Sequence, residues 1–381
     1  MSIYAFQIIL ICLFGLLFRK DKKKFLIFAF LILFVVMAFR HARMVGYDST
    51  SSYYSMFLGI EKYTLSWPNP GLPLVMKVIH AFSGDYQWVI IITAIWVCFA
   101  YYKLLIKYSE GAFISVMWFM GLLFYTVMLS AIKQAWAMAF LCFAFDAIFE
   151  KRPIRFLLFV GLASIFHFPA LVFLPAYWIG KLRINKAFPL LMFSAFVIVF
   201  IFRQQILNLM TSTYSNGEGT DYSATQFLGT KVLFMILLLS YGVYRYYLVG
   251  SENRVFCSLL YYMGIAAVIQ TFCFYNNIFE RLADYYYQFS ILFLPLILKR
   301  SDLESNHIDN ATQDSVTNER SYLTKVGKKS ISIGDIDTSS ILAVVIVAFC
   351  VWRYISYMVN DAFFSPFYFF WQDVNIALRF S

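Results

Sequence analysis

The chain has 381 residues, of which 61% are hydrophobic and only 14% are charged, and its mean hydropathy is +0.70. Soluble domains carry about a quarter charged residues, so this composition excludes a soluble globular protein and predicts a polytopic membrane protein. The net charge of +10 comes from lysines and arginines in the loops, and it does not indicate nucleic-acid binding.

Eleven apolar stretches follow one another along the chain, and some extend into flanking aromatic residues to reach the ~20 residues that a straight span needs. They predict an all-α fold, a polytopic transmembrane helix bundle of about 11–12 spans. The stretches are residues 3–18, 25–39, 86–102, 112–129, 131–149, 156–179, 187–202, 227–247, 255–275, 282–298 and 340–357.

The orientation of the bundle follows from its basic loops, because lysine and arginine in short loops stay in the cytoplasm. Residues 19–24 are the strongest basic anchor. Placing them inside puts the N-terminus outside, and Lys103, Lys107 and residues 150–155 then also fall inside. The first stretch lacks a basic segment before it, so we expect a retained span and not a cleaved signal peptide.

Residues 156–179 are flanked by basic residues on both sides, and a single span would export one of these flanks. We therefore predict a short membrane hairpin that turns near residues 166–169. Each arm has about a dozen residues and a length of ~18 Å, too short for a ~30 Å hydrocarbon core. His167 is then expected at membrane depth, in an outward-facing cavity, because bare backbone at that depth must be buried or line water.

The chain divides into three predicted regions. Residues 1–298 form a transmembrane core that carries the outward-facing site. Residues 299–339 are mostly polar and form a disordered cytoplasmic loop. Residues 340–381 form the last transmembrane helix and an outer C-terminal tail.

Several charged side chains lie on the predicted outer side, where the positive-inside rule does not explain them. Arginine forks suit phosphate oxygens, so this set predicts an outward-facing anion site. Other interpretations stay open: lipid headgroup contacts, ion pairs within the set, a snorkelling lysine, or a capped helix end. The residues are Arg40, Arg43, Asp48, Lys133, Glu280 and Arg281.

His167 has no histidine or carboxylate neighbour in the sequence. A lone histidine serves either as a structural hydrogen-bonding group or as a catalyst, and both roles stay open. At a turn in the membrane, an imidazole can take up a proton or orient a phosphate.

Four segments resemble, in the same order, motifs of the EpsG/Wzy-like bacterial polysaccharide polymerase family. The segment from Arg40 to Phe57 is similar to an outer motif of arginine, valine-glycine-x-aspartate and aromatic residues. AIKQAWAMAF resembles the family's arginine-glutamine helix start, LASIFHFPALVFLP its phenylalanine-histidine hairpin, and ERLADYYYQFSILFLP its late arginine-tyrosine segment. The resemblance covers most of residues 1–300.

The resemblance implies a glycosyltransferase that polymerises undecaprenyl-diphosphate-linked oligosaccharide repeats into capsule, O-antigen or a similar polysaccharide. The reaction is expected at the outer face of the bacterial cytoplasmic membrane. The implied partners are this lipid-linked oligosaccharide, membrane lipids, and the flippase and chain-length regulator of the same pathway, without nucleic acid. Two positions depart from the family pattern: Lys133 stands where arginine is usual, and Asn69 stands where an acid often precedes the glycine.

The expected mechanism is glycosyl transfer with the diphosphate as leaving group, and it requires no metal and no other cofactor. The family's arginine, aspartate and histidine correspond to Arg40, Asp48 and His167. The predicted diphosphate-binding residues are Arg40, Arg43, Lys133 and Arg281. The candidates for the general base are Asp48, His167 and Glu280, without a ranking. The predicted substrate-binding residues are Tyr53, Tyr54 and Gln134.

Two other functions are considered. A flippase for the lipid-linked repeat unit also needs cations in a cavity, but it should line a path that reaches both faces. A membrane O-acetyltransferase acting on the glycan should present a histidine to a cytoplasmic acyl donor, whereas His41 and His167 are expected outside or at depth.

Overall fold

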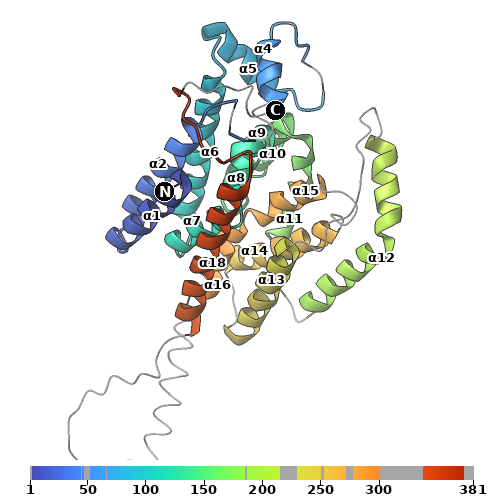
Figure 1. The fold of residues 1–381 in the computed structure, drawn as a ribbon. Coiled ribbons are helices and arrows are strands. Elements are labelled where there is room, and N and C mark those ends of the chain that lie inside the picture. Colours follow the sequence, from blue (N-terminus) through green and yellow to red (C-terminus); the bar gives the residue numbers. More distant parts are fainter. Residues whose placement is uncertain are drawn as a thin grey trace, which may run out of the picture.

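The computed structural model describes residues 2–43, 45–46, 52–65, 67–184, 187–214, 230–249, 253–271, 278–299 and 338–372. Within these ranges the chain is helical and forms no strand, apart from one isolated bridge between Arg40 and Phe369 (Figure 1). The predicted all-α bundle is confirmed. The predicted disordered loop at 299–339 lies almost entirely outside the described residues, so the three-region division stays a prediction.

Most of the helices follow the apolar stretches of the sequence, and each of the eleven stretches overlaps at least one of them. Short helices α4 and α5 lie between the second and third stretches. In chain order the elements are α1 (Ile3–Leu17), α2 (Lys22–Ala38), α4 (Ser52–Leu58), α5 (Gly71–Phe82), α6 (Gln87–Tyr108), α7 (Ala112–Gly121), α8 (Phe124–Ser130), α9 (Ile132–Phe149), α10 (Pro153–Phe166), the 3-10 helix η1 (Phe168–Phe173), α11 (Ala176–Ile179), α12 (Phe188–Tyr214), α13 (Thr230–Val249), α14 (Arg254–Gln270), α15 (Ile278–Tyr287), α16 (Ser290–Leu298) and α18 (Thr338–Asn360).

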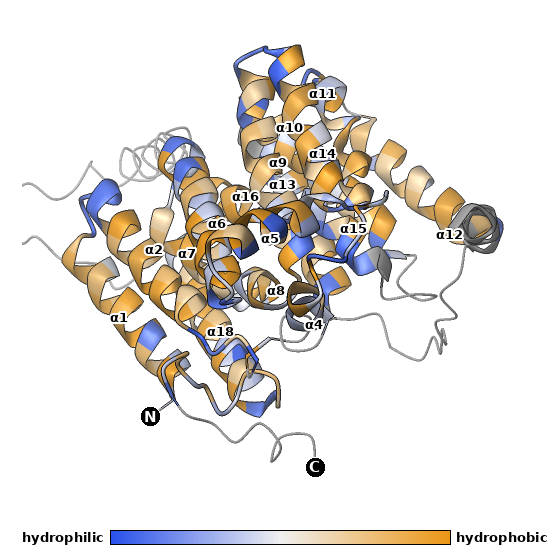
Figure 2. Cartoon of the chain, turned by 90° about the horizontal axis from the view of Figure 1, so that it is seen from above, coloured by the Kyte–Doolittle hydropathy of each residue, from blue (hydrophilic) through white to orange (hydrophobic). Residues whose placement is uncertain are grey.

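Three of the described helices are long and apolar enough to cross a membrane alone: α6, α9 and the Ser340–Asn360 part of α18. Helices α7 and α8 make a fourth span if they are counted together, with a bend of 54°. Leu123 sits at this break with a φ of 66°. Figure 2 shows hydrophobic residues over most of the helices and hydrophilic residues at helix ends and around α15.

Capping residues fix where several of these helices begin. The Ser2 hydroxyl accepts the Ala5 amide at 3.2 Å at the start of α1, and the Asp21 carboxylate accepts the Lys24 amide at 3.0 Å at the start of α2. Such side chains satisfy amides of the first turn that have no partner within the helix. Pro153 begins α10, where its missing N–H costs nothing.

Basic side chains gather at one end of the bundle, which we call the basic end. Lys22 Nζ donates to the Ser109 carbonyl at 2.6 Å and so joins the start of α2 to the end of α6. Lys107 Nζ donates to Glu150 at 3.1 Å, which joins α6 to the end of α9. Further contacts at this end are Arg155–Glu150 and Lys299–Glu110. These helix directions agree with the alternation of inner and outer loops that the basic residues predict. That the basic end faces the cytoplasm stays a prediction.

The predicted hairpin is confirmed, because residues 153–180 leave the basic end and return to it. The Arg152 amide donates to the Ala147 carbonyl at 2.9 Å at the end of α9. After the turn, the Gly180 carbonyl accepts the Ser258 hydroxyl at 3.4 Å near the start of α14. His167 separates the two arms. Helix α10 has 14 residues, hence a length of about 21 Å, less than the ~30 Å core.

The apex of the hairpin packs against the opposite end of the bundle. The Phe166 ring stacks on Trp136 of α9 with a centroid distance of 4.6 Å and an interplanar angle of 2°. Gly71 begins α5 so close to Phe166 that a Cβ there would lie 2.8 Å from the ring. Trp136 in turn donates to the Thr93 hydroxyl of α6 at 2.9 Å. Close packing of this kind drives helix association in membranes.

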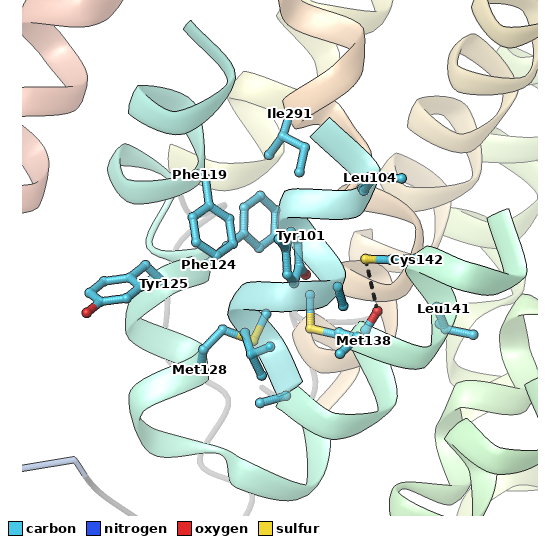
Figure 3. Close-up of a cluster of buried hydrophobic side chains, with 14 of the residues drawn as sticks. Tyr101, Leu104, Phe119, Phe124, Tyr125, Met128, Met138, Leu141, Cys142 and Ile291 are labelled. Carbon is cyan, nitrogen blue, oxygen red and sulfur yellow. Dashed lines mark hydrogen bonds between the residues drawn. The ribbon is translucent and has the colours of Figure 1, made fainter. Parts of the chain in front are cut away.

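The centre of the bundle is filled with aromatic and sulfur-containing side chains from α6, α7, α8 and α9, with α16 alongside (Figure 3). Tyr101 is fully buried there, and its hydroxyl donates to Gln288 Oε1 at 2.7 Å. Cys142 Sγ donates to the Met138 carbonyl within α9 at 3.4 Å. Gln288 directly follows α15, so this core also fixes the helix that carries the late arginine-tyrosine segment.

Candidate functional site

Polar side chains gather around the hairpin apex, at the end of the bundle opposite the basic end. They come from the start of α9, from α15 and from the turn between α10 and η1. We call this set the apex cluster, and its members are Lys133, Gln134, His167, Arg281 and Tyr285.

His167 and Tyr285 form the centre of the apex cluster. The His167 Nδ1 atom and the Tyr285 hydroxyl are joined by a hydrogen bond, and the histidine is half-buried while the tyrosine is fully buried. Arg281 lies one helical turn before Tyr285, and the charges of Arg281 and Lys133 both act on the histidine ring. A neutral imidazole held in one orientation can accept a proton, and the two cations beside it can bind an anion.

Gln134 joins the two helices of the cluster. It is 2% exposed, and its Nε2 atom donates to the Arg281 carbonyl at 3.4 Å. Gln134 also interacts with Asp284. The neighbouring Lys133, in the first turn of α9, lies over the Tyr53 ring of α4 and acts electrostatically on His167.

The loop before α5 holds the backbone beside His167. Asn69 Oδ1 accepts the Phe168 amide at 2.7 Å, and the Trp67 ring meets the Phe168 ring edge-on at 5.3 Å. Asn69 has a φ of 70°, a left-handed conformation that asparagine adopts more easily than most residues. This side chain thus caps η1 at the turn that presents His167.

A second set of charges lies beside the apex cluster. Lys231 of α13 pairs with Glu280 at 2.9 Å and with Asp284 at 2.5 Å. Arg353 of α18 also acts on Glu280, and its Nη1 atom donates to the Gly121 carbonyl at 3.1 Å. We call these four residues the acid-lysine cluster. Because Glu280 is held by Lys231, the carboxylate is less available as a general base than His167.

Arg40 is placed differently from the sequence prediction. It is 0% exposed, one Nη atom donates to the Met37 carbonyl, and the other donates to the Leu129 carbonyl at 2.9 Å. These carbonyls belong to the last turns of α2 and α8, where helices leave carbonyls unpaired. The C-terminal tail covers this place, since the His41 amide donates to the Tyr368 carbonyl at 2.7 Å. The contacts therefore give Arg40 a structural role and do not leave its fork open to a diphosphate.

The other predicted residues that are described lie on or near α4. The Arg43 guanidinium stands over the Tyr54 ring at 4.8 Å, and the Lys133 ammonium lies 5.6 Å from the centre of the Tyr53 ring. Each of the two tyrosines predicted to bind the substrate thus has one of the predicted cations over its ring. Asp48 lies outside the described residues. Within the described ranges, no three His, Cys, Asp or Glu side chains gather as a metal site requires.

The comparison with protein families shows to which family the chain belongs. The model of the EpsG family matches residues 23–308, which is most of the chain. The chain belongs to the EpsG family. The comparison with curated proteins gave no match, and neither did the comparison with solved structures. Family membership and the apolar helices together indicate a membrane protein with a polysaccharide polymerase type of role.

The part that matches the EpsG family contains the whole apex cluster and Lys231, while Arg353 lies after it. Lys231 and Arg353 were missed from the sequence, although both lie within stretches that otherwise form apolar helices. A cation at such a position is costly unless it is paired, so the cost of its burial could have identified both residues. Their partners lie far away in the sequence and could not be identified in this way.

Proposed function

We propose that this EpsG-family protein polymerises undecaprenyl-diphosphate-linked oligosaccharide repeat units into a surface polysaccharide by glycosyl transfer. The reaction takes place at the outer face of the bacterial cytoplasmic membrane. The observation that carries the proposal is the hydrogen-bonded pair of His167 and Tyr285, with Arg281 and Lys133 beside it. Family membership supports the reaction class, and the apex cluster supplies the chemical groups for it.

The bond-forming step needs a proton acceptor. A hydroxyl of the acceptor sugar attacks the anomeric carbon of the growing chain, and the bond from that carbon to the diphosphate oxygen breaks. The hydroxyl proton passes to His167 Nε2, and the electron pair of the broken bond stays on the diphosphate. In this arrangement the Nδ1–H group donates a hydrogen bond to the Tyr285 hydroxyl oxygen, which fixes the ring and leaves the Nε2 lone pair for the acceptor hydroxyl.

The departing diphosphate gains negative charge as the bond breaks. Arg281 and Lys133 stabilise this charge electrostatically. Arg43 adds a further cation across α4, where it stands over the Tyr54 ring. No step requires a metal ion.

Replacing Arg281 with glutamine in cells that make the cognate polysaccharide is expected to lower polymer output by about 10²–10³-fold, as the loss of a charge-stabilising donor does in other enzymes. The glycan is resolved by chain length and compared at matched membrane abundance. Single lipid-linked units exposed on the outer face should accumulate. Arg254→Gln, the same change at the start of α14, is the control and should leave the ladder unchanged.

Two outcomes would contradict this proposal. Single units that accumulate on the inner face of the membrane in the Arg281→Gln strain would indicate a flippase. An unchanged ladder would remove Arg281 from the site.

Substitutions of Asn69 test whether the hairpin turn positions His167. Asn69→Gly keeps the left-handed backbone but removes the acceptor for the Phe168 amide, and the rate of chain extension should fall about tenfold. Asn69→Asp keeps an acceptor oxygen and should retain most of the rate. The KM for the acceptor should stay unchanged in both variants, because the loss affects the orientation of the base. An equal fall in both variants would assign the effect to something other than this hydrogen bond.

A further inference from the structure

An apolar cavity of 460 Å³ lies among α7, α13, α16 and α18. Only aromatic and aliphatic side chains line it, among them Trp118, Phe234, Tyr241, Leu294, Leu342 and Phe349. We call it the apolar groove. None of the charged residues discussed above lines it.

The apolar groove opens to the side of the bundle. Three of its lining residues are substantially exposed: Leu237 at 54%, Val345 at 57% and Leu342 at 37%. In a membrane protein, exposed aliphatic side chains at this depth face the hydrocarbon. A lipid chain can therefore enter the groove laterally from the membrane.

Cations stand at both ends of the apolar groove: Lys299 follows the lining residue Leu298 at the basic end, and Lys231 and Arg353 stand at the end nearer the apex cluster, which we call the mouth. Phe234 follows Lys231 by one turn of α13, and Phe349 precedes Arg353 by one turn of α18. At 1.5 Å per residue, the lining from Phe234 to Tyr241 reaches from about 5 Å to about 15 Å beyond Lys231. The groove thus offers an apolar channel of this depth with positive charge at its mouth.

The mouth of the groove also borders the reaction centre. Lys231 pairs with Asp284, and Asp284 interacts with Gln134 and directly precedes Tyr285 in α15. In this region the cations Lys231, Arg281 and Arg353 outnumber the two acids. An anionic head group at the mouth would therefore be attracted, and it would lie next to the apex cluster.

We propose that the apolar groove holds the head-proximal part of the hydrocarbon chain of a polyprenyl diphosphate lipid. Lys231 and Arg353 then lie nearest to its diphosphate, which points toward Arg281. This inference rests on the proposed function, since it assigns a lipid site to the substrate of that reaction. Charge and position together select the occupant: the mouth of the apolar groove carries an excess of cations and lies next to the apex cluster, as the anionic head group of a single-chain lipid substrate requires.

The full-length protein in phospholipid vesicles can be tested with a polyprenyl diphosphate that carries a diazirine near its head group. Photolabelling should fall on α13, α16 and α18. Leu237→Trp and Val345→Trp fill the groove and should lower the labelling about tenfold, which corresponds to 1.4 kcal/mol and to about two buried methylene groups. The controls Leu233→Trp and Val344→Trp alter exposed residues of the same helices outside the groove and should label like the wild type.

The outcomes separate this inference from the proposed function. Equal labelling by a diazirine phospholipid, or labelling mainly on α1 and α2, would overturn the lipid site. Competition by unlabelled polyprenyl diphosphate but not by inorganic diphosphate would support it. If the groove is labelled while the protein extends no glycan chain, the lipid site stands and the polymerase function fails. If groove-filled variants extend chains at the wild-type rate, the lipid site fails and the function stands.

Discussion

Replacing His167 with alanine is expected to lower the rate of glycan chain extension by about 10²–10⁴-fold, the usual contribution of a general base. The change removes the proton acceptor but leaves the packing of the hairpin apex on Trp136 intact. The measurement is a single-turnover assay in proteoliposomes with one lipid-linked repeat unit as donor and one as acceptor. Equal thermal unfolding midpoints for variant and wild type would show that the loss is chemical.

Two companion variants separate the possible roles of His167. His167→Gln keeps an N–H donor but cannot take up a proton, so it should be as slow as His167→Ala. Tyr285→Phe keeps the buried ring and removes the hydroxyl that orients the histidine, and a loss of about tenfold is expected. If the glutamine variant retained most of the rate, His167 would be a hydrogen-bond donor to the diphosphate, and the base would have to be sought elsewhere.

The hairpin is the part of the fold for which the sequence was most informative. Basic residues on both sides of residues 156–179 predict a segment that returns to the same side, and the structure joins Arg152 and Gly180 to the same end of the bundle. The positive-inside rule depends only on local charge, so it can be applied without knowledge of the packing. The bend between α7 and α8 depends on the left-handed conformation of Leu123. No local sequence pattern predicts this conformation.

The candidate site could be predicted only in part, because the cost of burying a charge identifies residues but not their partners. Lys133 and His167 were identified in this way and Arg281 as a charge on the predicted outer side, and Lys133 and Arg281 both act electrostatically on His167 in the structure. Arg40 was also identified as a charge in an unfavourable place, yet its partners in the structure are backbone carbonyls of two helices. Lys231 lies within a predicted apolar stretch and could have been identified by the same rule, but its partner Asp284 is far away in the sequence and could not.

Replacing Arg40 with alanine is expected to destabilise the protein and to leave its chemistry nearly unchanged. The change removes the donors to the Met37 and Leu129 carbonyls, and each buried carbonyl without a partner costs about 1–3 kcal/mol. The thermal unfolding midpoint in detergent should fall, and the membrane abundance should fall with it. The rate of chain extension per folded molecule should stay within about twofold of the wild type, since ~0.4 kcal/mol corresponds to a factor of two.

Arg43 provides the matched comparison, because it is also an outer arginine but stands over the Tyr54 ring and is only half-buried. Arg43→Ala should leave the unfolding midpoint almost unchanged, since a partly exposed cation–π contact contributes only ~0.5–1 kcal/mol. Its rate of chain extension should fall if the cation assists the diphosphate. The two arginines are thus expected to show opposite defects, one in stability and one in rate. A stable but inactive Arg40→Ala variant would instead assign the diphosphate to Arg40, and its carbonyl contacts would then have to open when the substrate binds.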